Sequence, residues 1–287
     1  MSGGIVNGTL NYEVMVSDLI PVTGNPVPTG DAPHWSPLAH TLIYGDTEAV
    51  LVDPPITQAQ TTRLAEWVEL RARHVTAIYI THAHADHWLG TALLLERFPD
   101  ATVFAGAATA EKIAADTANG VPGALWTTLF PDQLPTRVRF PVQTVPSDGF
   151  SIDGQILRSI DVGHTDTDDT TVLHVPSIGL VVAGDVVYNN VHLYLAEALN
   201  GGFDRWRHAL DTVAALNPTA VVSGHRDKTR PDLPETIAET RLYLDAAQEI
   251  LATASTRLEF FTAVTARFPE RINPYTTWLS ALRLFEH

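Results

Sequence analysis

Short apolar runs alternate with stretches of helical spacing along the first half of the chain. Gly45-Asp46 separates two of these runs and is typical of a hairpin turn, and residues 77–80 form a third run typical of a buried strand. The elements predicted here are strands at 12–20, 41–44, 49–52, 77–80 and 102–105, and helices at 61–73, 89–98 and 107–118. This alternation predicts a layered α/β domain.

The second half begins again with strands and then becomes entirely helical from Pro231 onward. The elements predicted here are strands at 155–161, 170–175, 180–183 and 220–223, and helices at 203–216, 233–254, 257–268 and 274–285. Two strand-rich halves with helices outside predict an α/β (α+β) fold, a four-layer αββα sandwich with a C-terminal helical extension. We expect residues 1–230 to form the domain that carries the chemistry, with the helices of 231–287 packed on it.

Composition narrows the chemistry. The 287 residues include 33 acidic and 18 basic side chains, a formal charge of -15, and no cysteine. The missing cysteine excludes disulfides, thiolate-ligated zinc, iron–sulfur clusters and thiol nucleophiles. Nucleic acid and anionic membranes repel a surface this acidic, so we expect neither as a partner. A small-molecule substrate remains, and the sequence does not decide whether the chain forms a homodimer.

The N-terminal residues point to no export signal. Residues 1–6 lack the basic flank and the long apolar run of a signal peptide. No stretch approaches the roughly 20 uninterrupted apolar residues of a membrane span. The expected location is therefore the cytoplasm.

Histidine and aspartate gather directly after the predicted strand 77–80. Within six residues stand four candidate metal ligands: His82, His84, Asp86 and His87. An extended backbone alternates sides, so His82 and His84 point the same way and can hold one ion. The chain then turns and presents Asp86 and His87 at a second point in space.

Three further candidates each follow a predicted strand and adjoin a glycine. They are His164, Asp185 and His225, in the pairs Gly163-His164, Gly184-Asp185 and Gly224-His225. Glycine lets the backbone turn sharply and approach a site closely. Imidazole nitrogen and carboxylate oxygen suit zinc, and also Fe, Mn or Co.

The ordered motifs His-x-His-x-Asp-His, Gly-His, Gly-Asp and Gly-His resemble those of the metallo-β-lactamase-fold hydrolase superfamily. The resemblance covers residues 82–225 and implies an αββα sandwich with two divalent metal ions. Zinc is the metal expected first among the candidates. The resemblance assigns His82, His84 and His164 to the first ion and Asp86, His87 and His225 to the second, with Asp185 bridging both.

Two such ions trap a bridging hydroxide that attacks a carbonyl carbon, so no Ser or Cys nucleophile is required. Asp86 has an alternative catalytic role, in which it orients the nucleophile or moves a proton. Asp53 resembles an aspartate of many relatives and is expected to accept a hydrogen bond from a ligand histidine; an equal alternative is a helix cap.

The residue at each motif position also separates branches of the superfamily. Asp185 stands where the thiolate β-lactamases carry cysteine, which argues against antibiotic hydrolysis, and His84 argues against the oxygen-reducing di-iron members. Tyr188 lies where lactonase-type members place a tyrosine that contacts the substrate, although an aromatic packed on the sheet would fit equally well. Basic residues follow His225, but the flanking pattern differs from glyoxalase II. We therefore expect a lactone or carboxylic ester hydrolase, with a glyoxalase II-type thioesterase or a mono-iron, sulfur dioxygenase-like oxidoreductase as alternatives.

Aromatic and polar side chains near these motifs are the candidate substrate contacts. His34 and Trp35 stand in a segment rich in proline and glycine, 21–37, and Trp126 in a second, 120–150. Loops of this kind often cover an active site, although a solvated connection has the same composition. Asn189 and His192 follow Tyr188 and could line the same pocket. Aromatic walls would suit a neutral or apolar substrate.

Overall fold

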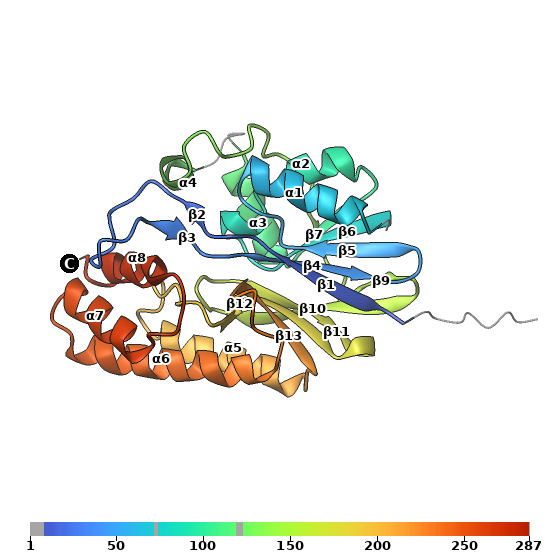
Figure 1. The fold of residues 1–287 in the computed structure, drawn as a ribbon. Helices are drawn as coiled ribbons and strands as arrows, with labels where there is room; N and C mark the ends of the chain where they lie inside the picture. Colours follow the sequence, from blue (N-terminus) through green and yellow to red (C-terminus); the bar gives the residue numbers. More distant parts are fainter. Residues whose placement is uncertain (1–8, 72–73, 119–122, 287) are drawn as a thin grey trace, which may run out of the picture.

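The computed structural model is a four-layer sandwich of two β-sheets between two layers of helices (Figure 1). The structure describes residues 9–71, 74–118 and 123–286. The N-terminal end of the chain and positions 72–73 and 120–122, which the sequence patterns include, lie outside the described residues. The predicted αββα architecture is confirmed.

The first sheet has the strand order β1-β4-β5-β6-β7-β8. Its strands are β1 (Asn11–Val16), β4 (Ala39–Tyr44), β5 (Glu48–Val52), β6 (His74–Ile80), β7 (Thr102–Ala105) and β8 (Gln143–Thr144). β5, β6 and β7 run parallel, with Val52 opposite Tyr79 and Ile80 opposite Ala105. Because parallel strands end at the same edge, the residues that follow Val52 and Ile80 meet there.

The second sheet has the order β13-β12-β11-β10-β9. Its strands are β9 (Phe150–Ile152), β10 (Gln155–Gly163), β11 (Thr170–Val175), β12 (Leu180–Asn189) and β13 (Ala220–Arg226). β12 and β13 are parallel, and Tyr188 lies opposite His225. A separate two-stranded ribbon pairs β2 (Ile20–Pro21) with β3 (His34–Trp35).

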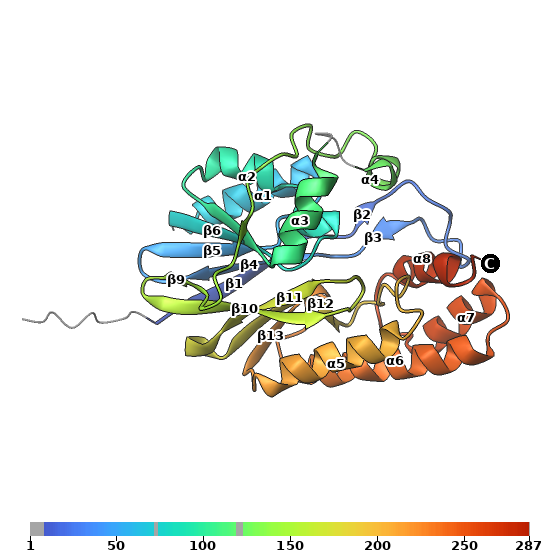
Figure 2. The same cartoon turned by 180° about the vertical axis from the view of Figure 1, so that it is seen from behind.

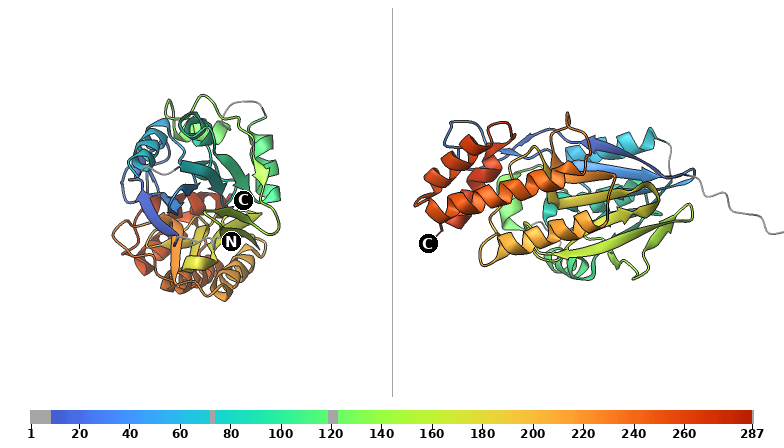
Figure 3. Two further views of the ribbon diagram at one scale, coloured as in Figure 1. Left: turned by 90° about the vertical axis from the view of Figure 1, so that its right-hand side faces the viewer. Right: turned by 90° about the horizontal axis from the view of Figure 1, so that it is seen from below.

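Helices cover both outer faces. The α-helices of the described residues are α1 (Gln58–Glu69), α2 (Thr91–Arg97), α3 (Ala107–Asp116), α4 (Ala124–Leu129), α5 (Gly202–Ala215), α6 (Glu235–Thr253), α7 (Arg257–Arg267) and α8 (Pro274–Leu284). α1, α2 and α3 lie on the first sheet and α5 and α6 on the second, as both face views show (Figures 1 and 2). α7 and α8 lie at the end of the sandwich that also holds β2 and β3 (Figure 3).

Alternating side chains of β5 divide between two apolar cores. Ala49 and Leu51 belong to the larger core, which includes residues of α1 and extends into the C-terminal helices. Val50 and Val52 belong to a second core, where they meet residues of β11, β12 and β13 between the sheets. This division follows from the two-residue period of a strand, and both faces of β5 are therefore buried.

β12 is longer than the sequence pattern predicts. The prediction ends at Ala183, because Gly184-Asp185 has the composition of a turn, but the strand continues to Asn189 and all ten residues are buried. Gly184 has a φ of 49° and marks a register shift against β13, so it forms an irregularity within the strand. α4 was also not predicted, because it is short and lies between segments rich in proline and glycine.

The C-terminal helices share the larger core with the sandwich. Ala247 of α6, Phe260 of α7 and Ala281 of α8 are all buried in it. Within the described parts of the chain, no helix combines the length and apolar character needed to cross a bilayer.

His192 supplies a test of this packing, because it is buried against α6. Its Nδ1 lies 3.0 Å from Tyr243 Oη, and burial, assisted by the charge of Arg271, lowers its pKa from 6.5 to about 3. Between these two values the unfolded chain binds a proton at His192 that the folded chain does not, so acidification below pH 6.5 favours unfolding.

We expect His192→Gln to reduce this loss of stability by up to about 1.4 kcal/mol per pH unit. Urea unfolding of both proteins between pH 5 and pH 7 measures the difference in slope. His208→Gln, which removes an exposed histidine of α5, is the matched control. Equal slopes for wild type and His192→Gln would contradict the assignment.

Candidate metal centre

The histidine-rich segment lies at the edge of the first sheet where β6 ends. His82 follows the strand by two residues, and Asp86 and His87 lie in a single 3₁₀ turn, Ala85–His87. The side chains of His82, Asp86 and His87 are buried, and that of His84 is 22% exposed. The strand end and the turn thus place these four side chains at the interface of the two sheets.

One group of candidate ligands consists of Asp86, His87 and His225, whose nearest ligand atoms all lie within 4.8 Å of one another. Asp86 Oδ2 is 3.4 Å from His225 Nε2 and 3.8 Å from His87 Nε2. Asp185 adds its two oxygens, with Oδ1 3.3 Å from His87 Nε2 and Oδ2 3.2 Å from His225 Nε2. The structure therefore brings together the residues expected for the second ion, with Asp185 beside them.

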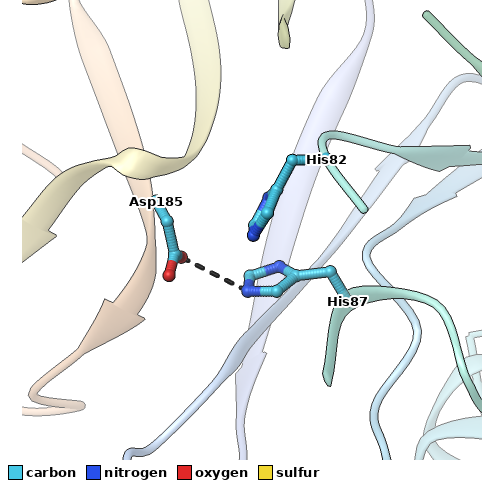
Figure 4. A group of neighbouring side chains, drawn as sticks. All are labelled: His82, His87 and Asp185. Carbon is cyan, nitrogen blue, oxygen red and sulfur yellow. Dashed lines mark ion pairs between the residues drawn. The ribbon is translucent and has the colours of Figure 1, made fainter. Parts of the chain in front are cut away.

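Asp185 also faces the other half of the site. His82, His87 and Asp185 form a second group within the same 4.8 Å limit, and Figure 4 shows the three side chains pointing toward one another. Gly224 makes this approach possible, because a Cβ at that position would overlap Asp185 Oδ1. Asp185 thus lies between the two halves of the cluster, as expected of a bridging residue.

The third group contains a residue that the sequence patterns did not single out. It joins His82 and His84 to Asp166, whose Oδ2 lies 2.8 Å from His84 Nδ1 and 3.8 Å from His82 Nε2. His164 was expected here, but it belongs to none of the three groups formed by the described residues. A signal was available, since Asp166 stands only two residues after His164 in the same turn.

The inward atoms of the cluster fit a cation. His82 Nε2, His87 Nε2, His164 Nε2, Asp185 Oδ1 and Asp166 Oδ2 are buried and make no well-aligned hydrogen bond, although the two carboxylate oxygens lie 3.3 Å from His87 Nε2 and 2.8 Å from His84 Nδ1. A buried polar atom without a hydrogen bond is costly, and all of these residues except His164 belong to the groups whose ligand atoms lie within 4.8 Å of one another. Imidazole and carboxylate donors at such spacing suit divalent ions of the zinc, iron or manganese type.

Outer hydrogen bonds fix which ring nitrogen faces inward. Asp53 Oδ2 lies 3.0 Å from His87 Nδ1 and also accepts a hydrogen bond from Thr81 Oγ1 at 2.9 Å. The same Thr81 hydroxyl lies 3.0 Å from His82 Nδ1, and His225 Nδ1 lies 3.1 Å from Pro37 O. With these nitrogens engaged, the Nε2 lone pairs of His82, His87 and His225 are directed inward.

Asp53 takes the position expected of an outer partner of a ligand histidine. Helix α1 begins instead with a Thr57 cap, whose side chain accepts a hydrogen bond from the backbone N–H of Gln60. Asp53 has a φ of 54°, a left-handed conformation that Asp tolerates better than most residues. Its backbone N–H donates to Tyr79 O of β6 at 2.9 Å, which holds the turn against that strand.

The electrostatics of the cluster favour positive charge. Burial lowers the pKa of His225, but the charge of Asp185 and hydrogen bonds to Asp185 and Asp86 outweigh it and raise the pKa to about 10. Burial raises the pKa of Asp86, yet neighbouring His87 and His225 hold it well below its usual range. The buried carboxylates thus stabilise cationic charge at this place.

A cavity of about 580 Å³ opens onto the cluster. Its metal-facing wall includes His84, Asp86, Asp166, Asp185 and His225. The remaining wall is largely apolar and aromatic and includes Trp35, Leu125, Trp126, Leu129, Tyr188, Tyr194, Leu279 and Leu282. A small molecule in this cavity would therefore contact an apolar wall and the metal ligands together.

Trp35 connects the apolar wall to the metal ligands. Its indole Nε1–H donates a hydrogen bond to Asp86 Oδ2 at 2.8 Å. Its ring meets those of Trp126 and Phe130 edge-on, with centroid separations of 5.4 and 5.5 Å. β3, which contains Trp35, is thus part of the cavity wall.

Of the five expected substrate contacts, the cavity takes in Trp35 and Trp126. The other three side chains do not line it: His34 Nδ1 lies 2.9 Å from Ala32 O, Asn189 donates to Pro231 O, and His192 meets Tyr243. Asn189 and His192 are buried because β12 and the chain after it run beneath α6. Glu197, which the sequence patterns did not indicate, lines the cavity with Oε1 3.6 Å from His84 Nε2.

Asp53→Asn tests the outer hydrogen bonds. The substitution replaces the carboxylate that orients His87 directly and His82 through Thr81. We therefore expect zinc affinity to fall about 10–100-fold with the fold intact. Zinc titration against a competing chelator measures the affinity. Asp100→Asn, at an exposed carboxylate that pairs with His74, is the matched control. Unchanged affinity in Asp53→Asn would contradict the orienting role.

Comparison with known proteins agrees with this geometry. The chain is similar to hydroxyacylglutathione hydrolases: 41% identical over 71 residues to that of Parasynechococcus marenigrum (25% of this chain, 26% of the relative), and 36% over 64 residues to that of Francisella philomiragia (22% and 24%). The matched segment spans about a quarter of the length of these curated relatives.

Among solved structures, the fold is similar to a metallo-beta-lactamase from Pontibacter korlensis, with a TM-score of 0.57 and 21% identity over 81% of this chain and 99% of the other. The metallo-beta-lactamase FIM-1 from Pseudomonas aeruginosa, solved in a mono-zinc form, gives a TM-score of 0.57 and 18% identity, covering 82% and 92% of the two chains. The family model described as "Metallo-beta-lactamase superfamily" matches residues 40–225, which contain all the candidate metal ligands. The chain belongs to the metallo-beta-lactamase superfamily.

Proposed function

We propose that this protein is a metal-dependent hydrolase that cleaves a carboxylic ester or lactone with an apolar acyl group. One observation carries the proposal: the Tyr188 hydroxyl, in the wall of the cavity that opens onto the metal ligands, donates a hydrogen bond to Asp185 Oδ2 at 2.7 Å. A hydroxyl donor and a metal centre thus face the same apolar space.

The chemistry requires activated water and a polarised carbonyl. Divalent ions, when bound by the histidine and aspartate cluster, supply a water activated at neutral pH and a Lewis acid for the carbonyl oxygen. Asp86 and Asp185 are suited to orient that water and to accept its proton. Both line the cavity, and neighbouring histidines keep both ionised. No side-chain nucleophile is required.

Tyr188 is suited to donate a hydrogen bond to the substrate. Burial raises its pKa well above 10, and the charge of Asp185 adds to this, so the hydroxyl stays protonated at physiological pH. Its ring stacks on His225 with a centroid separation of 5.6 Å and packs against Trp206, which fixes its direction. To stabilise negative charge on the carbonyl or leaving oxygen, the hydroxyl would exchange its hydrogen bond to Asp185 Oδ2 for one to the substrate.

The apolar part of the cavity supports an uncharged acyl group. Trp35, Trp126 and Leu125 form one side and Leu279 and Leu282 of α8 contribute to another. The basic residues of the lining have acidic neighbours: Arg283 pairs with Glu286 at 3.0 Å, and Lys112 lies 3.8 Å from Asp169. Such a cavity favours a ring or acyl chain over a strongly anionic substrate.

A thioester is the second candidate, and the similarity to hydroxyacylglutathione hydrolases supports it. An acyl-thiol and an acyl-alcohol present the same carbonyl to the cluster, so the two proposals differ in the leaving group. The charged ends of glutathione would have to bind near Lys112 and Arg283, the basic residues in the cavity wall.

A substrate panel tests the proposal directly. We expect the zinc-loaded protein to hydrolyse apolar lactones and carboxylic esters with kcat/KM at least about tenfold above that for glutathione thioesters and phosphodiesters. Faster turnover of the glutathione thioester would favour the second candidate. A protein purified with one iron per chain, consuming oxygen and hydrolysing none of these substrates, would contradict both.

Tyr188→Phe tests the hydroxyl. Loss of a donor to the developing oxyanion is expected to lower kcat about 100-fold on a lactone. Zinc content, measured by elemental analysis, should stay at the wild-type value. Tyr12→Phe, at a half-buried tyrosine of β1, is the matched control. Wild-type kcat in Tyr188→Phe would remove the residue from the mechanism.

A further inference from the structure

We propose that the cavity contains a polar subsite for a neutral oxygen of the substrate, formed by the hydroxyls of Ser36 and Thr276. The inference rests on the proposed function and deepens it: besides the bond that is cleaved, the ester or lactone carries a carbonyl, ether or hydroxyl oxygen in its acyl part. Both hydroxyls lie outside residues 40–225, the part of the chain that the family model matches.

Three polar side chains form a buried cluster where β3 meets α8. Ser36 directly follows β3, Asn273 directly precedes α8, and Thr276 lies in the first turn of that helix. The Asn273 amide donates to Ser36 Oγ at 2.7 Å and to Thr276 Oγ1 at 3.1 Å, and the two hydroxyl oxygens lie 2.9 Å apart. All three residues are at most 8% exposed, and both hydroxyl residues line the cavity.

The hydrogen bonds of this cluster leave one donor without an acceptor. Each hydroxyl has a single hydrogen, and the contact between Ser36 and Thr276 uses one of the two. Asn273 only donates to the pair, and within the described parts of the chain no other group accepts the remaining hydrogen. A buried donor without an acceptor is costly, so the cluster is suited to bind an acceptor that a ligand brings into the cavity.

The residues on either side of Ser36 contact the candidate metal ligands. Trp35 Nε1 donates to Asp86 Oδ2 at 2.8 Å, and Pro37 O lies 3.1 Å from His225 Nδ1. The Ser36 hydroxyl therefore stands beside the part of the cavity where the carbonyl to be cleaved would bind. An oxygen a few bonds away in the same substrate can reach it.

One face of α8 extends from this subsite toward the solvent. Thr276 is buried, whereas Leu279 and Leu282, the next positions on the same face, are half-buried and also line the cavity. An apolar chain along the two leucines thus has its oxygen-bearing end at Thr276. Among the described residues, no charged side chain hydrogen-bonds to the cluster, so it fits a neutral oxygen better than an anion.

Matched esters test the subsite. The substrates are a straight-chain acyl ester and a series in which one methylene at a time is replaced by a carbonyl. With the zinc-loaded wild type we expect one member of the series to exceed the parent ester in kcat/KM by about fivefold, the effect of a typical neutral hydrogen bond. Ser36→Ala/Thr276→Val removes both hydroxyls and should abolish this preference. Thr277→Val, which removes a buried hydroxyl of the same helix that faces Tyr243, is the matched control and should keep it.

The change in preference between proteins decides the outcome, because a carbonyl also alters the reactivity of the ester. The same preference in the wild type and the double variant, or no preference in the wild type, would overturn the subsite. Circular dichroism controls for folding. If the double variant is unfolded, at least one of the single variants Ser36→Ala and Thr276→Val must lower the preference, and the subsite is overturned if neither does.

Ligand binding separates this subsite from the proposed function. Benzylacetone and butylbenzene differ in one carbonyl, and tryptophan fluorescence reports their binding because Trp35 and Trp126 line the cavity. We expect the affinity for benzylacetone relative to butylbenzene to be about fivefold higher in the wild type than in Ser36→Ala/Thr276→Val. This result in a protein that hydrolyses no ester would contradict the proposed function and support the subsite. Equal relative affinities, or no binding of either ligand, would overturn the subsite.

Discussion

Buried carboxylates at the interface of the two sheets are the constraint on which the site depends. Asp86, Asp166 and Asp185 are all at most 2% exposed, and each lies within 4 Å of an imidazole nitrogen. Charges this deep are tolerated only where opposite charge compensates them. The first sheet supplies the histidine-rich turn and the second supplies Asp185 and His225, so the compensation is complete only when the sheets are packed face to face.

Strand ends explain how the chain builds this arrangement. β5 and β6 are parallel and end beside each other, which brings Asp53 to Thr81 and the histidines that follow. β12 and β13 repeat the arrangement in the second sheet, where the register places Tyr188 opposite His225. Each half alone would carry an unsatisfied set of polar groups, and the outer hydrogen bonds from Asp53 and Pro37 leave the free ring nitrogens facing inward.

Much of the fold and of the histidine-rich site could be predicted from the sequence, because the relevant signals are local. The apolar run before His82 and the spacing of the turn after it are read directly from neighbouring residues, and β7 is found at the predicted bounds. Tertiary effects account for the remainder. Gly184-Asp185 has the composition of a turn but is an irregularity inside β12. The position of the His164 ring depends on its contacts with Asp168 and Gly202, and Gly202 is 38 positions away along the chain.

The hydrogen bond from Trp35 to Asp86 has a consequence for how this protein can diversify. Because one indole both lines the cavity and donates a hydrogen bond to the candidate ligand Asp86, a substitution at Trp35 that reshapes the cavity also removes a contact of the metal centre. Trp126 contacts the Trp35 ring, 5.4 Å away between centroids, and Leu125 is 53% exposed at the mouth. Changes in specificity are therefore most accessible through α4, whose side chains shape the cavity one layer away from the ligands.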